Sequence, residues 1–465
     1  MSLRFGTDGV RGVAGTELTA DLALALGRAA ARALILPGGE ARPSCLVGRD
    51  TRWSGPMLQA AFSAGLAGEG VDVVDLGVLP TPGVAAAAAD RRVPAAVISA
   101  SHNPFVDNGI KLLAAGGRKL SDVEEETVES ELESLLLKGP AAAGARTGPA
   151  PRSGDGLGRL TADPEVRAWY CRQVVASLGG RSLAGVKVAV DCANGAATTT
   201  AATILESAGA DLVDVLAAAP DGTNINDGCG STDPGGLARS VLAHRAHVGL
   251  ALDGDADRVI AVDNEGHVVD GDRLLALFAT DLHSRGLLAH GTVVVTVMTN
   301  LGFHQAMAEA GIAVHQTPVG DRYVLEALDA HRWSLGGEQS GHLIFRDLAT
   351  TGDGVLSGLL LIDLLVRHGR PLSELAAQAM VRLPQVLRNV SVKDHANLDQ
   401  AEEVWAEVRA VERELGDGGR VLLRPSGTER MVRVMVEAPT QAEAAGAADH
   451  LAAAVRGALG APSGS

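Results

Sequence analysis

Cysteine is scarce in this sequence, and long apolar runs are missing from it. The four cysteines include no CxxC pair, and in a chain this long we expect ordinary reduced thiols. The best apolar run, Val355 to Val366, contains Asp363 and is shorter than the roughly 18 residues that a membrane span requires. The start, Met1 to Arg11, lacks the apolar core of a signal peptide. We therefore predict a cytoplasmic protein.

An excess of positive charge is also missing. The formal net charge is −16, and an acidic protein is a poor non-specific partner for nucleic acid or anionic lipid. We expect neither nucleic acid nor membrane as a partner. An anionic substrate would need cations placed locally, so the positions of the arginines are informative.

One structural unit recurs three times along the chain. Each copy has an apolar strand that ends in a polar residue, a helical stretch, a glycine and a second strand, which is the pattern of a βαβ unit. The copies begin at Cys45, Val186 and Val293. Their β-branched runs suit strands that are covered on both faces. The sequence thus predicts an α/β fold with three related α/β domains that contain mixed sheets.

The C-terminal part follows a different pattern, with strand-like segments at 384–392, 420–424 and 432–437 and a helix from Asn397. This order predicts an α+β domain. A domain has about 100–150 residues, so a chain of 465 residues has room for three or four. We place the four domains at 1–155, 156–256, 257–369 and 370–460.

The acidic segment Asp253 to Arg258, with the sequence DGDADR, follows a predicted strand. Its three carboxylates, at Asp253, Asp255 and Asp257, alternate along one short loop, where a divalent cation would remove their mutual repulsion. All-oxygen ligands suit a hard ion such as Mg²⁺. An EF-hand is excluded because the twelfth position of the loop is Asn264 instead of a glutamate. The alternative is a solvated acidic turn.

The segment Ile98 to Phe105 delivers a serine into a short turn. Pro104 fixes its own φ and keeps Asn103 out of the helical region, so the hydroxyl of Ser101 is held on a rigid loop. We predict that Ser101 carries a phosphoryl group, with Lys111 close enough along the chain to neutralise it or to move a proton. The alternatives are a Ser/Asn turn that bonds its own backbone and a surface lysine.

Three further loops carry polar residues between glycines. Gly336 to His342 presents Glu338, Gln339 and Ser340, which suit hydroxyls or an amine. The segment Arg424 to Arg430 could form an anion nest from Ser426, Thr428 and the amides around Gly427, with Arg424 as the charged donor. Phe5 to Gly12 is a glycine-rich loop that carries Arg11. The alternatives are a plain polar loop and a hairpin with exposed arginines.

Taken together and in this order, the loops resemble those of the α-D-phosphohexomutase superfamily. The resemblance extends from Phe5 to about Val434 and consists of ISASHNPF, DGDADR, GEQSGH and RPSGTE. Within the superfamily, the FGTDGVRG start and the glutamine at Gln339 are most similar to the bacterial phosphoglucosamine mutase branch. The resemblance implies four domains around a central cleft, and a role in supplying cell-wall amino sugars.

The resemblance also implies residue roles. Ser101 would be the phosphoserine, and its phosphoryl oxygen would join Asp253, Asp255 and Asp257 as ligands of Mg²⁺. Sugar hydroxyls would be held by two residues, Glu338 and Ser340. The non-reacting phosphate would be held by Arg424, Ser426, Gly427, Thr428 and Arg433. Phosphoryl and proton transfer would be supported by Arg11, Lys111, Arg258 and His342. One departure is Arg430, where the family usually has proline.

The predicted reaction interconverts glucosamine 6-phosphate and glucosamine 1-phosphate, with glucosamine 1,6-bisphosphate as intermediate and activator. The alternatives are a phosphomannomutase/phosphoglucomutase and a serine-dependent phosphatase. The sequence leaves open whether Lys111 or His342 relays the proton, and whether the protein is a monomer or a homodimer.

Overall fold

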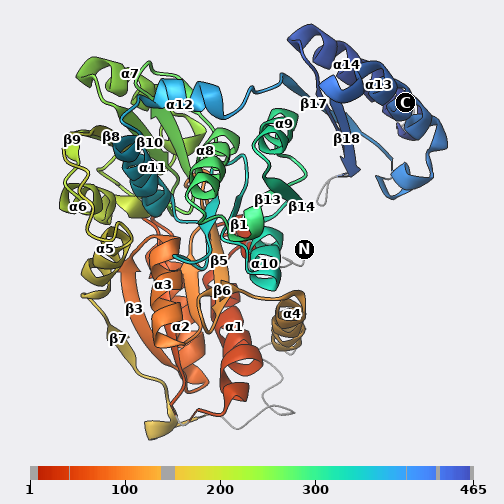
Figure 1. The fold of residues 1–465 in the computed structure, drawn as a ribbon. Helices are drawn as coiled ribbons and strands as arrows, with labels where there is room; N and C mark the ends of the chain where they lie inside the picture. Colours follow the sequence, from red (N-terminus) through yellow and green to blue (C-terminus); the bar gives the residue numbers. More distant parts are fainter. Residues whose placement is uncertain (1–8, 41, 138–151, 394, 426–429, 461–465) are drawn as a thin grey trace. The chain divides into compact units, whose positions relative to one another are not determined.

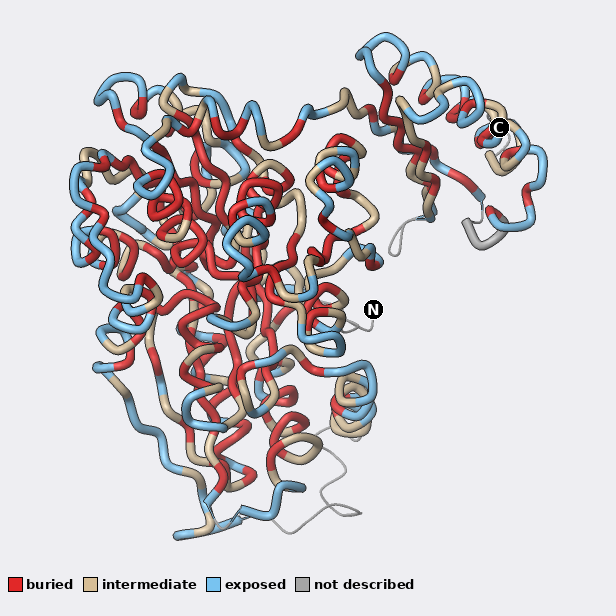
Figure 2. Tube along the Cα trace, in the orientation of Figure 1, coloured by how far each residue is buried: buried red, intermediate tan, exposed pale blue. Residues whose placement is uncertain are grey.

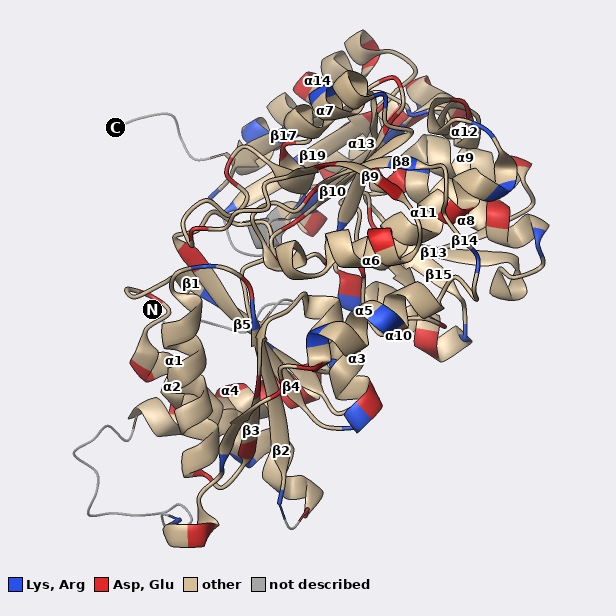
Figure 3. Ribbon diagram, turned by 90° about the vertical axis from the view of Figure 1, so that its left-hand side faces the viewer, with Lys and Arg blue, Asp and Glu red and all other residues tan. Residues whose placement is uncertain are grey.

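The computed structural model describes residues 9–40, 42–137, 152–393, 395–425 and 430–460. The chain divides into two compact units (Figure 1): a larger one of residues 1–298 and 312–377, and a smaller one of residues 299–311 and 378–465. Within the described residues, no helix combines the length and apolar character needed to cross a membrane. Charges of both signs are interspersed along the helices and strands (Figure 3).

The first sheet of the larger unit has parallel strands at its centre and antiparallel strands at one side. Its order is β1-β5-β4-β2-β3-β7, and β6 pairs with β5. The strands from β4 through β2 and β3 to β7 are parallel, whereas β5 is antiparallel to β4 and β1. The strands are β1 (Val10–Val13), β2 (Ser44–Arg49), β3 (Asp72–Val78), β4 (Ala95–Ile98), β5 (Asp107–Ala114), β6 (Arg118–Lys119) and β7 (Leu160–Ala162).

Three helices share one apolar core with this sheet: α1 (Ala20–Ala30), α2 (Gly55–Gly68) and α4 (Asp122–Leu137). Every residue of β4 is buried, and Figure 2 shows the central strands in the colour of buried residues. A fourth helix, α3 (Thr81–Arg91), contacts β2 and β4. The continuous apolar character of β4 therefore reflects cover on both faces.

The second sheet has the order β12-β11-β10-β8-β9. Strands β9, β8 and β10 are parallel, and β11 and β12 continue as antiparallel strands. Its strands are β8 (Lys187–Asp191), β9 (Asp211–Leu216), β10 (Val248–Leu252), β11 (Val259–Asp263) and β12 (Val268–Val269). Its helices are α5 (Val166–Ala176), α6 (Ala201–Ser207), α7 (Gly235–His244) and α11 (Gly354–His368).

The third sheet has the order β14-β13-β15-β16, with β14, β13 and β15 parallel and β16 antiparallel. Its strands are β13 (Thr292–Thr296), β14 (Ala313–Thr317), β15 (Leu335–Gly337) and β16 (Leu343–Phe345). Helices α8 (Gly271–Ser284) and α10 (Asp321–His331) pack against it.

The smaller unit is built on an antiparallel sheet of order β17-β19-β18 with its own apolar core. Residues 299–311 are the first part of the chain in this unit, and the chain returns to it through α12 (Leu372–Ala379). Its strands are β17 (Gln385–Ser391), β18 (Arg420–Pro425) and β19 (Met431–Glu437), and its helices are α9 (Leu301–Glu309), α13 (Glu402–Leu415) and α14 (Gln441–Leu459). A capping box of Thr440 and Glu443 begins α14.

These sheets confirm the predicted α/β class with mixed sheets and an α+β C-terminal part. The four-domain division stays a prediction, and strand pairing differs from it at two places. Strand β7 lies beyond residue 155 but pairs with β3, and β11 lies beyond residue 256 but pairs with β10. The predicted start of a helix at Asn397 is wrong, because residues 395–400 form a 3₁₀ turn and α13 begins at Glu402.

The four loops that carry the motifs ISASHNPF, DGDADR, GEQSGH and RPSGTE share one topology, which the sequence did not predict. Each loop joins two antiparallel neighbours: β4 to β5, β10 to β11, β15 to β16, and β18 to β19. In a hairpin, the end of the first strand and the start of the second lie next to each other at the same end of the sheet. Residues before and after each loop can therefore point side chains into the same space.

Candidate active site

Ser101 lies in the loop between β4 and β5 and is 1% exposed. Its backbone has φ +53°, in the left-handed region that non-glycine residues rarely adopt. Its hydroxyl donates a hydrogen bond to Asp253 Oδ2 at 2.6 Å. The structure thus brings together the serine and the acidic loop, which the sequence separates widely.

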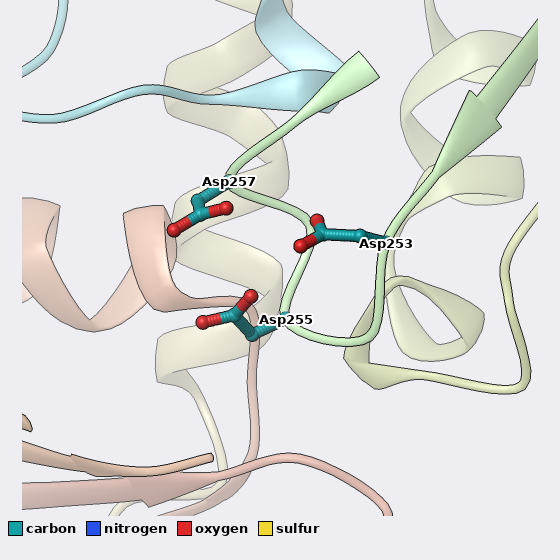
Figure 4. Close-up of side chains that lie close together, drawn as sticks. All are labelled: Asp253, Asp255 and Asp257. Atoms are coloured by element: carbon teal, nitrogen blue, oxygen red, sulfur yellow. The ribbon is translucent and has the colours of Figure 1, made fainter. Parts of the chain in front are cut away.

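The three aspartates lie in the loop between β10 and β11, and Figure 4 shows their carboxylates converging. One oxygen from each of Asp253, Asp255 and Asp257 lies within 4.8 Å of the others, and all three residues are buried. Among the described residues, neither Asp255 Oδ1 nor Asp257 Oδ1 has a hydrogen-bond partner. A buried carboxylate oxygen that accepts no hydrogen bond is costly, and such oxygens are the ligands that a hard divalent cation prefers.

The electrostatics of this cluster also favour a cation. Burial and the two neighbouring aspartates raise the pKa of Asp253 to about 8. Burial alone would raise the pKa of Asp257, but Lys111 and His342 hold it well below the usual range. The buried carboxylates thus oppose one another's ionisation, and a divalent cation would remove that repulsion, so the residues present fit a bound metal ion.

Lys111, on β5, is buried with its Nζ 2.6 Å from Asp255 Oδ2 and 3.5 Å from Asp257 Oδ2. The interpretation of this residue as a surface lysine is therefore wrong. Thr81, at the start of α3, donates its hydroxyl to the same Asp255 oxygen at 2.6 Å. Sequence reasoning missed Thr81, although a threonine followed by Pro82 marks a helix start.

His342, directly before β16, is buried between two carboxylates. Its Nδ1 lies 3.8 Å from Asp257 Oδ2, and its Nε2 lies 3.4 Å from Asp321 Oδ2. Burial opposes a charge on the ring, but Asp321 and Asp257 outweigh it and raise the pKa of His342. The Gly352 N–H donates to Nε2 at 3.0 Å. When the ring is neutral, this hydrogen bond favours the tautomer that carries its proton on Nδ1, facing Asp257.

Asp321 is a second residue that sequence reasoning missed. It lies in the first turn of α10 and also accepts a hydrogen bond from Lys119 of β6 at 2.6 Å. This links the first sheet to the helix that positions His342. An acid in the first turn of a helix was the available signal, but such acids are common.

Arg11 and Arg258 contribute positive charge near Ser101. The backbone N–H of Arg258 donates to Asp253 Oδ1 at 3.2 Å, and the Arg258 side chain places its Nε 3.7 Å from Asp257 Oδ1. Arg11, on β1, is the register partner of Gly109 on β5. Burial, with Arg258 and Arg11, lowers the pKa of His102 to about 4. The surroundings of Ser101 therefore hold two cationic side chains beside a neutral His102, and these two cations favour an anionic ligand.

The polar side chains of the loop between β15 and β16 differ in their hydrogen-bond partners. Glu338 is half-buried and accepts a hydrogen bond from the Gly320 N–H at 3.2 Å, and burial raises its pKa. Ser340 Oγ is buried with no hydrogen-bond partner among the described residues. Gln339 instead donates to Asp272 Oδ2 at 3.1 Å. Glu338 and Ser340 are thus the members of this loop with capacity for a ligand.

In the smaller unit, Arg424 of β18 and Arg433 of β19 are direct register partners. Burial and the nearby Arg433 charge lower the pKa of Arg424. Like charges directly opposite each other on a sheet are destabilising, so this pair favours an anion between them. Ser426, Gly427 and Thr428 lie outside the described residues, and Arg430, the departure from the family pattern, is exposed.

Models of one protein family match four successive segments of the chain. They are described as phosphoglucomutase/phosphomannomutase alpha/beta/alpha domains I, II and III and C-terminal domain, and they match residues 2–137, 170–266, 270–383 and 387–454.

Two relatives are about half identical to the chain over its full length. A phosphoglucosamine mutase of Frankia alni is 52% identical, covering 99% of this chain and 100% of that protein. One of Thermobifida fusca is 53% identical, covering 98% of each.

Among solved structures, a phosphoglucomutase/phosphomannomutase family protein from Burkholderia thailandensis has a TM-score of 0.80 at 26% identity, covering 98% of each chain. Aspergillus fumigatus N-acetylphosphoglucosamine mutase, in complex with GlcNAc-6P and magnesium, has a TM-score of 0.65 at 18% identity, covering 99% of this chain and 96% of that one. The fungal protein shares the fold.

Proposed function

The chain belongs to the phosphoglucomutase/phosphomannomutase family of α-D-phosphohexomutases, and we propose that it interconverts glucosamine 6-phosphate and glucosamine 1-phosphate. Membership of the family confirms the resemblance seen in the sequence and makes the protein a phosphohexomutase, an enzyme of the isomerase class. The amino sugar follows from relatives named phosphoglucosamine mutase that are about half identical over the whole chain. The cytoplasmic location stays a prediction, and the sequence left open whether the protein is a monomer or a homodimer.

One observation carries the reaction type: the buried Ser101 hydroxyl donates to Asp253 in the acidic loop. We propose Ser101 as the phosphoryl carrier and Asp253, Asp255 and Asp257 as the ligands of Mg²⁺. When bound, that ion would neutralise the charge that develops on the transferring phosphoryl group. A hard ion fits because the cluster offers only carboxylate oxygens.

In the first transfer, a free hydroxyl of the sugar phosphate attacks the phosphorus of phospho-Ser101. The bond between phosphorus and Ser101 Oγ breaks, and the proton of the sugar hydroxyl ends on the serine oxygen. Lys111 and His342 both face Asp257, so each is a candidate to carry this proton. The product is glucosamine 1,6-bisphosphate. A second transfer returns the other phosphoryl group to Ser101.

The remaining proposed roles are binding roles. Glu338 and Ser340 would hold sugar hydroxyls, because the half-buried Glu338 carboxylate and the buried, partnerless Ser340 Oγ lie in one loop and have capacity for a ligand. Arg424 and Arg433 would hold the non-reacting phosphate through paired guanidinium groups. The sequence adds three further residues to this proposed phosphate site: Ser426, Gly427 and Thr428. Arg11 and Arg258 would neutralise the reacting phosphate.

The test is turnover of glucosamine 6-phosphate with Mg²⁺ and a trace of hexose bisphosphate, compared between the wild type and Ser101→Ala. We expect formation of the 1-phosphate without release of inorganic phosphate, and a loss of at least about 1000-fold in the alanine variant. Ser177→Ala, at the end of α5, is the matched control and should keep full activity.

A panel of glucose, mannose and glucosamine phosphates tests the substrate. Faster turnover of a 2-hydroxy sugar would move the assignment to a phosphomannomutase/phosphoglucomutase. Continuous release of phosphate would show a phosphatase instead, and unimpaired activity in Ser101→Ala would contradict the whole scheme.

A further inference from the structure

Arg52 has no exposed surface and is the largest fully buried side chain among the described residues. It follows β2, outside every motif that the sequence analysis singled out. A buried guanidinium is rare unless its charge and its donors are matched by partners. The partners of Arg52 therefore indicate what it does.

Arg52 donates hydrogen bonds to four carbonyl groups of the Ser101 loop. One terminal nitrogen bonds the carbonyls of Ser101 at 2.9 Å and Asn103 at 2.8 Å. The other bonds the carbonyls of Asp107 at 3.0 Å and Pro104. Only the planar fork of an arginine offers enough donors in one plane for such a set. The guanidinium group thus fixes the backbone of the loop at four carbonyl groups.

The charge of Arg52 is matched by Asp50, which is also fully buried. Asp50 Oδ2 accepts from Arg52 Nε at 2.9 Å and from the Ser99 hydroxyl at 2.6 Å. Ser99 Oγ in turn accepts the backbone N–H of Ser101 at 3.0 Å. Both backbone polar groups of Ser101 are therefore connected to the same ion pair, the carbonyl directly and the N–H through Ser99.

Asn226 supports the same loop from the segment between β9 and β10. Its Nδ2 donates to the carbonyls of Ser101 at 2.9 Å and Asn103 at 3.0 Å. Gly254 of the acidic loop adds a close contact, because a Cβ there would lie 2.5 Å from the Ser101 carbonyl oxygen. The Ser101 carbonyl is thus fixed by Arg52 and Asn226 together.

This arrangement explains how Ser101 keeps its left-handed backbone. Such a conformation is strained for a residue with a Cβ and persists only where the surroundings enforce it. We propose that Arg52 and Asn226 are positioning residues that hold Ser101 in this conformation and so direct its hydroxyl at Asp253. The proposal rests on the proposed function for the chemistry of Ser101, whereas the fixed loop itself can be tested without any reaction.

The first test uses the full-length variants Arg52→Lys and Asn226→Gly. Lysine keeps the charge but cannot reach four carbonyls, and glycine keeps the φ of +58° at position 226 while it removes the amide donor. Arg367→Lys is the control, because Arg367 is exposed and bonds Asp281 and Asp363, not the loop. Each protein is examined by amide hydrogen exchange without substrate or metal.

We expect exchange in residues 99–109 to be roughly tenfold faster in both loop variants and unchanged in Arg367→Lys. Peptides from β10 and β11 should exchange as in the wild type. Exchange that is unchanged in residues 99–109 would contradict the proposal. Exchange that is equally faster throughout the first sheet would also contradict it, because Arg52 and Asn226 would then stabilise the whole sheet and not the Ser101 loop in particular. If Arg52→Lys does not fold, Asn226→Gly decides the question alone.

The second test follows phosphorylation of Ser101 by mass spectrometry after addition of a hexose 1,6-bisphosphate. In both loop variants we expect phosphorylation and kcat to be about 100-fold slower, with KM within about threefold of wild type, because a displaced nucleophile impairs the transfer step and spares sugar binding. Phosphorylation at the wild-type rate in both variants would overturn the positioning role. Failure of the wild type itself to accept a phosphoryl group would instead overturn the proposed function.

Discussion

At the scale of the single residue, burial raises the pKa of several carboxyl groups in this protein. Asp353, the N-cap of α11, is an example outside the acidic loop of Asp253, Asp255 and Asp257. It accepts hydrogen bonds from the Leu356 N–H at 2.9 Å and from the Tyr170 hydroxyl at 2.8 Å. Burial nevertheless raises its pKa to about 6. A carboxylate held in this way is ionised at a cost to folding.

This cost predicts a dependence of stability on pH. The unfolded chain releases the Asp353 proton near pH 4, at its ordinary pKa, and the folded protein near pH 6. Between these values the folded state binds more protons, so this group lowers the free energy of unfolding as pH rises. We measure the free energy of unfolding in urea for wild type and Asp353→Asn at pH 4.5 and at pH 7. The difference, variant minus wild type, should be more positive at pH 7, because only the wild type has a carboxyl group to ionise there.

Tyr170→Phe is the companion variant for this measurement. It removes the donor that favours the ionised carboxylate, so it should steepen the decline in stability with rising pH. A difference between wild type and Asp353→Asn that is the same at both pH values would contradict the raised pKa.

At the scale of the element, helices α1 and α2 pack closely because glycines face each other. A Cβ at Gly65 of α2 would lie 2.2 Å from the Leu24 carbonyl oxygen of α1, and one at Gly27 of α1 would lie 2.2 Å from the Phe62 carbonyl oxygen. Backbone cannot move aside as a flexible side chain can. The contact therefore needs glycine on both helices.

Gly65→Ala should accordingly destabilise the protein by about 1–3 kcal/mol, through overpacking. Gly68→Ala, in the last turn of the same helix, is the matched control, since nothing lies within 4 Å of the position of its Cβ. That change should be neutral or stabilise by up to about 1 kcal/mol, because alanine favours helix. Thermal unfolding checks both, and equal effects of the two substitutions would refute the close contact.

At the scale of the whole molecule, the candidate metal site and the paired arginines belong to different compact units. The acidic loop lies in the larger unit, and Arg424 and Arg433 lie in the smaller one. A ligand that binds only the folded form of a unit stabilises that unit. The two ligands should therefore protect different parts of the chain.

Hydrogen exchange of the full chain tests this separation. Mg²⁺ should slow exchange in β10 and β11, and a chelator should reverse the effect. Inorganic phosphate without metal should slow exchange in β18 and β19. Asp255→Asn should abolish only the first effect, and Arg424→Met only the second. Protection of the arginine strands by Mg²⁺ alone would argue against the assignment of the two sites.

The sequence predicted the parts of the site that are encoded locally. Three carboxylates at alternate positions of one loop favour a hard cation, and Pro104 stiffens the Ser101 turn through its own ring. The class of fold could also be predicted, because strand and helix periods are local properties. The sequence did not place β7 with the first sheet, because its pairing with β3 joins segments far apart in the chain. It separated β11 from β10 because the predicted domain boundary at residue 256 fell inside the hairpin loop that joins these strands.

The sequence by itself determined which chemical groups the protein carries and which loops present them. Only the tertiary structure decided which groups face one another: Lys111 with Asp255, Thr81 with the same carboxylate, and Arg52 with the carbonyls around Ser101. These contacts join segments that no local pattern connects. Their strength depends on burial, which raises the energy of an unmatched charge or donor and so requires each partner to be in place.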